Sequence, residues 1–124
     1  MADFWTIRLP YATPPLRLNG RQHWATKARI TRELIHAVTV GSWQQKMMPC
    51  ESIHVELIYV PRDRRARDRD NLVATLKPCI DALVRAGLVP DDTPEFVSWA
   101  PPIIAPPDSK DPHLRLEITR GKRG

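Results

Sequence analysis

The feature that most constrains how this chain can fold is a hydrophobic period that changes several times along the sequence. Apolar residues alternate with polar ones within 5–9, 53–59 and 114–118. Alternation is typical of a half-buried β-strand, because successive side chains point to opposite faces of a sheet. Between these stretches, apolar residues recur at helical spacing within 24–38 and 72–83. The chain is therefore predicted to contain helices placed between strands.

A further short strand is predicted in "EFVSWA" at 95–100, and the proline-rich "PPIIAPP" that follows is expected to end it. The expected order is strand, helix, strand, helix, strand, strand. This order favours an α+β fold with a small mixed β-sheet covered by two helices. A length of 124 residues is that of one ordinary domain, and 42% apolar residues suffice for one core. We therefore expect a single domain over residues 1–124.

The first predicted helix begins at Trp24, after the loop "PYATPPLRLNGRQH", and ends either at Gly41 or at the "MMP" of 47–49. Its apolar residues fall within about a third of the helix circumference. These residues are Trp24, Ala28, Leu34, Ile35 and Val38. We expect this stripe to face the core.

The second predicted helix has Asp70 as its N-cap and Gly87 as its C-cap. Pro78 lies inside the helical pattern and should either kink the helix or start a new one. The predicted core stripe consists of Leu72, Leu76, Cys79, Ile80 and Leu83. For Cys79, core packing is therefore the favoured interpretation.

Composition narrows the classes of protein. The N-terminus has no uninterrupted apolar region of the signal-peptide kind, and no run approaches the roughly 18 apolar residues of a membrane span. The two cysteines, Cys50 and Cys79, lack CxxC spacing, which favours reduced thiols in a cytoplasm. We expect no membrane partner and no organic cofactor.

A formal net charge of +5 favours an anionic partner. The basic residues gather in two groups: Arg62, Arg64, Arg65, Arg67 and Arg69, and Arg17, Arg21, Lys27, Arg29 and Arg32. Arginine binds phosphate oxygens through two donors at once, which lysine cannot do. Nucleic-acid binding and a merely solvated basic face both remain open on this evidence.

Carboxylates stand at both ends of the second predicted helix. If the preceding strand extends that far, Asp68 and Asp70 point to one face with Cα atoms about 6.6 Å apart. Two carboxylates that close repel unless a cation lies between them, and Arg67 and Arg69 would point to the other face. Mg²⁺ prefers such oxygen ligands, and Asp91 and Asp92 could complete the set.

Each of these features also has a structural explanation that remains open. "PDDT" is favourable turn chemistry. Asp70 can act as a helix cap without any metal, and Asp68 can form a surface ion pair with a neighbouring arginine. Lys77 can pair with Asp81, four residues further along the same helix.

Lys77 adds a geometric observation. At 100° per residue, it lies about 20° from Asp70 around the helix and roughly opposite the stripe that contains Leu72. It is therefore predicted to lie outside the core, with its ammonium directed toward the helix N-terminus. Carboxylates that hold a metal, together with such a lysine, suit phosphoryl chemistry.

The motifs "P…LNG…HW", "RRARDRDNL", "LKPCIDALVRAGL" and "PDD" together resemble the RusA family of Holliday-junction resolvases over nearly the whole chain. Asp68, Asp70 and Asp92 match the metal-binding aspartates of the family, and Asp91 is the adjacent member of the pair. Arg67 matches a basic residue used near the scissile DNA, and Asn71 matches as well. The family lysine four residues after the second aspartate is replaced by Ala74, so its role is carried over to Lys77.

The resemblance implies a small homodimeric endonuclease, bacterial or phage-encoded, that depends on Mg²⁺, with Mn²⁺ as a possible substitute. It would bind four-way DNA junctions and place symmetric nicks. Asp68, Asp70 and Asp92 would hold one or two ions with support from Asp91. The arginines of 62–69, together with Arg17, Asn19, Arg21 and Lys27, would contact the DNA backbone without reading the base sequence.

Two alternatives remain open. One is a DNA-binding recombination accessory protein without catalysis, in which the acids serve as caps and ion pairs. The other is a nuclease that acts on flaps or other branched DNA. A sugar-nucleotide site of the glycosyltransferase kind is set aside, because 124 residues leave little room for a nucleotide-binding domain beside this core.

Overall fold

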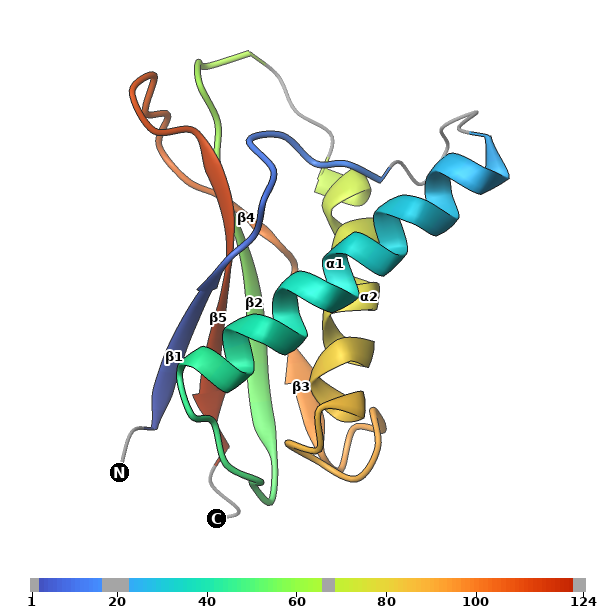
Figure 1. The fold of residues 1–124 in the computed structure, drawn as a ribbon. Coiled ribbons are helices and arrows are strands. Elements are labelled where there is room, and N and C mark those ends of the chain that lie inside the picture. The colour runs from blue at the N-terminus through green and yellow to red at the C-terminus, as the bar shows by residue number, and fades with distance from the viewer. Residues whose placement is uncertain (1–2, 17–22, 66–68, 122–124) are drawn as a thin grey trace.

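The computed structural model describes residues 3–16, 23–65 and 69–121; for residues 69–71 it describes the backbone alone. Two helices and five strands make up this part of the chain (Figure 1). The helices are α1 (Trp24–Gln44) and α2 (Arg69–Arg85). The strands are β1 (Phe4–Arg8), β2 (Ile53–Val60), β3 (Val97–Trp99), β4 (Ile103–Ile104) and β5 (His113–Arg120).

The strands form one mixed sheet in the order β1-β5-β2-β3, with β4 also paired to β2. β5 is antiparallel to both β1 and β2, whereas β3 and β4 run parallel to β2. The buried side chains alternate along each long strand, so that Ile7, Leu116 and Val55 lie on the covered face. α1 packs against β1 and α2, and α2 packs against β2. The predicted α+β fold with a mixed sheet and two helices is confirmed.

The prediction of four strands is wrong, because "PPIIAPP" contains β4. Ile103 and Ile104 pair in parallel with Ile58 and Tyr59 of β2, and the amide of Ala105 donates to the carbonyl of Tyr59 at 2.9 Å. Prolines on both sides lack an amide hydrogen, which limits this strand to two residues. A strand at the sheet edge tolerates such neighbours because one of its sides needs no partner.

α1 begins at Trp24 as predicted, and Nδ1 of the N-cap His23 accepts a hydrogen bond from the amide of Ala25. Neither predicted end is correct, because the helix continues through Gly41 to Gln44. The chain then turns at Lys46, which has a φ of 55°. The amide of Met47 donates to the carbonyl of Ser42, and that of Lys46 donates to Trp43, which together satisfy the last turn.

The stripe predicted for α1 is only partly correct. Leu34 and Val38 are fully buried, Ala28 and Ile35 are partly buried, and Ile30 joins the core. Trp24, however, is 76% exposed. The first turns of α1 project beyond the sheet and past α2 (Figure 1), so the helical pattern continues where no second layer covers it.

α2 begins at Arg69, so Asp70 lies within its first turn and is not the N-cap that was predicted. One helix runs through Pro78, which excludes a new helix at that point. The five residues of the predicted stripe are all buried, with Cys79 fully inaccessible. This burial holds both halves of α2 against the rest of the core, although Pro78 donates no backbone hydrogen bond.

Gly87 ends α2 as predicted. It has a φ of 90°, which a side chain would disfavour, and its amide donates to the carbonyl of Val84 at 2.9 Å. The amide of Leu88 donates to the carbonyl of Leu83 at 3.2 Å, which completes a Schellman motif. Both leucines are buried, so the chain leaves the helix in a defined direction. Over the described ranges, neither helix combines the length and apolar composition needed to cross a membrane.

Candidate functional site

The structure describes only some of the predicted site residues. Asp68, Arg67, Arg17, Asn19 and Arg21 lie outside the described residues. Of Arg69, Asp70 and Asn71, only the backbone is described, and it forms the first turn of α2. The site can therefore be built from Lys77, Asp91, Asp92, Lys27 and the arginines at 62, 64 and 65.

The strand geometry predicted for the aspartates is not observed. β2 ends at Val60, just before Pro61, and Asp70 lies on a helix. The two-residue alternation of a strand therefore does not relate Asp70 to Asp68, nor Arg69 to Arg67. The physical reason is that proline cannot continue the ladder of hydrogen bonds, so the chain leaves the sheet before it reaches the acidic residues.

Lys77 and Asp92 line one cavity of about 110 Å³, together with Ile80 and Trp99. Lys77 and Ile80 come from the middle of α2, Asp92 from the loop after it, and Trp99 from the end of β3. Lys77 is exposed, as predicted, and its Nζ lies 5.7 Å from the centre of the Trp99 ring. The fold thus places a cation, a carboxylate and an aromatic ring around one small hollow.

The Lys77–Asp81 ion pair, one of the structural alternatives, is not formed. Asp81 instead pairs with Arg85, with Nε and Oδ2 3.1 Å apart. Lys77 has no ion-pair partner among the residues that the structure describes, and the same holds for Asp92. Both side chains are therefore available to a ligand.

The "PDDT" segment, residues 90–93, is bent, and the hydrogen-bonded turn follows it, where the amide of Phe96 donates to the carbonyl of Thr93 at 2.9 Å. Oδ1 of Asp91 accepts a hydrogen bond from the amide of Asp92 at 2.8 Å, which gives Asp91 a structural role. This segment brings Asp92 to the cavity that Lys77 and Ile80 also line. Lys77 itself follows Asp70 by about two helical turns, roughly 10.5 Å along the axis of α2.

Ala74, which stands where the resembled family has a lysine, is partly buried and packs against the hydrophobic core. Lys77 is exposed at the cavity instead. A lysine at 74 would have to extend from a position that packs against the core. The position of Lys77 on α2 is thus the one that presents an ammonium to the cavity.

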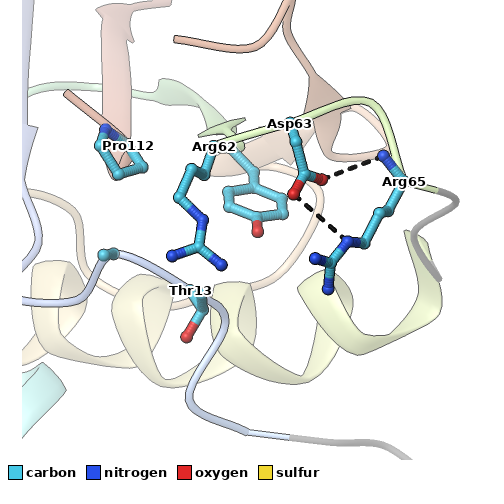
Figure 2. A pocket seen from close by; sticks show the side chains of 7 residues that line it. Thr13, Arg62, Asp63, Arg65 and Pro112 are labelled. Atoms are coloured by element: carbon cyan, nitrogen blue, oxygen red, sulfur yellow. Dashed lines mark hydrogen bonds and ion pairs between the residues drawn. The ribbon is translucent and has the colours of Figure 1, made fainter. Parts of the chain in front are cut away.

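The arginines after β2 border a larger cavity of about 380 Å³ (Figure 2). Its lining residues are Ala12, Thr13, Tyr59, Arg62, Asp63, Arg65 and Pro112. The amide and Nε of Arg65 contact the Asp63 carboxylate at 3.1 and 3.3 Å. Arg62 extends toward the segment of Thr13 and has no hydrogen-bond or ion-pair partner within 3–16, 23–65 and 69–121. Arg64 is also exposed.

A neighbouring hollow of about 290 Å³ shares Ala12 and Pro112 with this cavity. It is bordered further by Arg8, Tyr11 and His113. Arg8 forms a two-pronged ion pair with Asp111, which lowers the pKa of that carboxyl. Arg8, Arg62 and Arg65 thus border the two hollows, with Arg8 paired to Asp111 and Arg65 to Asp63, and we refer to the two hollows together as the basic groove.

The second predicted basic group, around the start of α1, contributes less. Arg29 pairs with Glu33 four residues later, at 2.9 Å, which fits the interpretation as a solvated helix face. Lys27 is partly exposed and lines none of the hollows described above.

Sequence reasoning missed several lining residues. Trp99 ends the short strand predicted in "EFVSWA", yet the pattern alone does not reveal that its ring meets Lys77. Thr13, Tyr11 and Pro112 carry no local signal, because they reach the basic groove only through the pairing of β1 with β5. Residues of this kind are found through the fold.

Among the described residues, no group of three or more potential metal ligands lies together. The predicted set includes Asp68 and the side chain of Asp70, which are outside the description, so the metal site stays a prediction. Asp92 suits it, since its carboxylate is exposed and pairs with no cation among the described residues, and Mg²⁺ binds oxygen ligands of this kind. Comparison with protein-family models gives no match, and comparison with curated proteins gives no significant match.

Proposed function

We propose that this protein is an Mg²⁺-dependent endonuclease that resolves Holliday junctions by paired symmetric nicks, in DNA recombination and repair. The observation that carries the proposal is the meeting of Lys77 and Asp92 at one cavity, from a helix and a separate loop. A second support is the basic groove, in which Arg62 and Arg65 come from the segment between β2 and the same helix. The resemblance of the sequence to RusA-family resolvases agrees with both.

In this proposal the basic groove binds the DNA backbone. Arg62 has an exposed guanidinium without a partner in the part of the chain that the structure describes, and Arg65 is oriented by its contacts to Asp63. Guanidinium groups donate two hydrogen bonds at once to phosphate oxygens. Such contacts fix the position of a duplex arm without reading its sequence.

Lys77 acts at the scissile phosphate. Its ammonium stabilises the negative charge that develops on the phosphoryl oxygens, and the exposed position of its side chain leaves room for that contact. Asp92, with Asp68 and Asp70, would hold the metal, and Asp91 would support it by accepting a hydrogen bond from the amide of Asp92. When bound, Mg²⁺ supplies positive charge near the phosphate and favours deprotonation of the attacking water.

A homodimer with two-fold symmetry would present two such sites to one junction. Two equivalent sites suit paired cuts in a DNA structure that is itself nearly symmetric. A monomer with one site would instead favour a single nick.

The alternative of a non-catalytic DNA-binding accessory protein is supported by the basic groove alone. It requires the arginines but makes no use of Lys77 or Asp92. The two proposals therefore differ in what substitutions at the small cavity should do.

The test is cleavage of a synthetic four-way junction in Mg²⁺, compared with a flap and a plain duplex in the same experiment. Asp92→Asn and Lys77→Met should each slow cleavage by at least about 100-fold, while junction binding in EDTA weakens far less. Most of the affinity should remain, because neither substitution changes the basic groove, which supplies the contacts to the DNA backbone in this proposal.

Matched controls are Glu51→Gln and Lys46→Met, which change exposed residues that line none of the hollows. Both should cleave at the wild-type rate. Wild-type protein that binds the junction but never cuts it, in Mg²⁺ or Mn²⁺, would establish the accessory role instead. Faster cleavage of the flap than of the four-way junction would indicate that the substrate is a flap or another branched DNA.

A further inference from the structure

Trp99 is unusually placed for a tryptophan on a strand. It is the last residue of β3, at the edge of the sheet (Figure 1), and pairs in register with Val55 of β2. Val97, two residues earlier on the same side of the strand, is buried, whereas Trp99 is 43% exposed. A large apolar ring is thus left partly open to solvent on the helix side of the sheet.

The surroundings of the ring point to the chemistry of a ligand. Ile80 contributes an aliphatic surface, Lys77 a cation 5.7 Å from the ring centre, and Asp92 a carboxylate. An aromatic face next to a cation suits a nucleotide, whose base is a flat ring and whose phosphate is an anion.

The size of the hollow limits how much of a ligand can enter it. Its volume of about 110 Å³ is well below the roughly 300 Å³ at which pockets for complete small ligands begin. It therefore suits one unit of a longer molecule, held in place elsewhere. A DNA strand bound along the basic groove satisfies this requirement.

We propose that Trp99 is a stacking platform for a single unstacked base, and that it gives the protein its preference for branched over continuous DNA. The inference rests on the proposed function, because it places the base next to the phosphate that Lys77 contacts. Trp99 acts as a specificity-determining residue of that site.

The affinity gained by stacking and the affinity lost by extracting a base together explain why branched DNA would be preferred. Stacking of a base on an aromatic side chain contributes roughly 5- to 150-fold to affinity. Extracting a paired base from a continuous duplex costs roughly 100-fold, and much less where the base is already unpaired. Stacking on Trp99 therefore gives little net gain with a continuous duplex, but a clear gain with a single strand or at a branch point where a base pair opens.

The other exposed tryptophans lack this environment. Trp43, at the end of α1, is 70% exposed but lines none of the hollows. It is thus a matched control for the general effect of removing an exposed indole.

The experiment measures binding in EDTA, where no cleavage can occur, to three labelled DNAs: a four-way junction, a 12-nucleotide single strand and a duplex. Trp99→Leu should weaken binding to the junction and the single strand by about 5- to 150-fold, and to the duplex by less than about 2-fold. Trp99→Phe should retain most of the affinity, because phenylalanine still stacks. Trp43→Leu should bind all three like the wild type.

Equal losses for Trp99→Leu and Trp99→Phe, or an equal loss on duplex and junction, would overturn the proposal. So would unchanged binding of Trp99→Leu. If Trp99→Leu does not fold, a variant with Trp24→Phe and Trp43→Phe keeps Trp99 as its only exposed tryptophan. Its fluorescence should be quenched by a thymidine oligonucleotide and not by an abasic one of equal length, and equal quenching by both would overturn the proposal.

This readout separates the two proposals. If the protein is not a nuclease, junctions stay uncut in Mg²⁺ while Trp99→Leu still weakens binding in EDTA. If Trp99 does not stack on a base, Trp99→Leu cuts junctions normally and binds them with the affinity of the wild type.

Discussion

The hydroxyl of Tyr11 donates a hydrogen bond to Oε2 of Glu33, which ties the segment after β1 to the outer side of α1. Tyr11 also borders the basic groove, so this bond holds one wall of the groove against the helix. Glu33 is in turn contacted by Arg29, and the pKa of its carboxyl is held below the usual range, mainly by the Tyr11 hydroxyl. The wall of the groove is thus positioned by a contact between segments distant in sequence.

This contact should be visible in the titration of Tyr11. Burial, and next the hydrogen bond to Glu33, raise the pKa of Tyr11 to about 12. The folded protein therefore keeps this proton to a higher pH than the unfolded chain, whose phenol ionises near 10. The contribution to stability is complete below about pH 10 and declines as the pH rises from 10 to 12. The difference in tyrosinate absorbance between wild type and Tyr11→Phe, followed against pH, gives the pKa of Tyr11. A titration midpoint near pH 10 would contradict the contact with Glu33.

Gly41 should be required for the docking of α1 on β1. A Cβ at this position would lie 2.7 Å from Cγ2 of Ile7, which is part of a stiff β-branched side chain. Gly41→Ala should add overpacking of about 1–3 kcal/mol, offset by a gain in helix propensity of about 1 kcal/mol, for a net loss of about 1 kcal/mol. Urea unfolding at constant m-value measures the change.

The control for this prediction is the same substitution in an Ile7→Ala background, where the clashing methyl group is absent. There, Gly41→Ala should stabilise the protein relative to Ile7→Ala alone. Equal effects in the two backgrounds would show that the close approach of α1 to Ile7 does not determine the cost.

The two cysteines should differ in reactivity. Cys79 is fully buried, which raises the pKa of its thiol to about 12, whereas Cys50 is partly exposed. The thiolate is the reactive form, so a Cys50→Ser variant should react with an aromatic disulfide reagent at pH 8 only after denaturant is added. Wild type should lose one thiol per chain quickly under native conditions. Rapid native labelling of Cys50→Ser would show that the α2 stripe opens readily.

The basic groove should be detected in the salt dependence of DNA binding. Each phosphate neutralised in B-form DNA contributes roughly 0.9 to the slope of log K against log salt, because counterions are released. Arg62→Gln should reduce the magnitude of this slope by about 0.9 and weaken binding to junctions and duplexes alike. Arg85→Gln, an exposed arginine at the end of α2 outside the groove, is the matched control. A slope unchanged by Arg62→Gln would exclude a phosphate contact at this residue.

Features that depend on local pattern were predictable. The stripe of α2 from Leu72 to Leu83 was found correctly because helical spacing decides which side chains share a face. The same reasoning placed Lys77 outside the core and Gly87 at the helix end, where a positive φ favours glycine. The alternating stretches around Ile7, Val55 and Leu116 formed strands as predicted, because alternation decides which side chains share one face of a strand.

Predictions failed where a local signal was overruled by packing. Gly41 is a helix-ending residue by propensity, yet it lies within α1. There the absence of a side chain on Gly41 leaves room for Ile7 of β1. Trp24 continues an apolar stripe, yet it is exposed because the sheet does not extend beneath that turn. β4 was missed because two residues between prolines carry no periodicity, and only the free edge of β2 makes them a strand.

The sequence by itself determined the α+β class, the buried stripe of α2, the alternating faces of the long strands and the position of Lys77 outside the core. Only the tertiary structure decided that Asp92 and Trp99 meet Lys77 at one cavity, and that Arg62 faces the segment of Thr13. The physical reason is that periodicity and turn preference act over a few residues. Contacts between distant segments depend instead on how α2 docks on the sheet and how the strands are registered, and both are set by packing of the whole core.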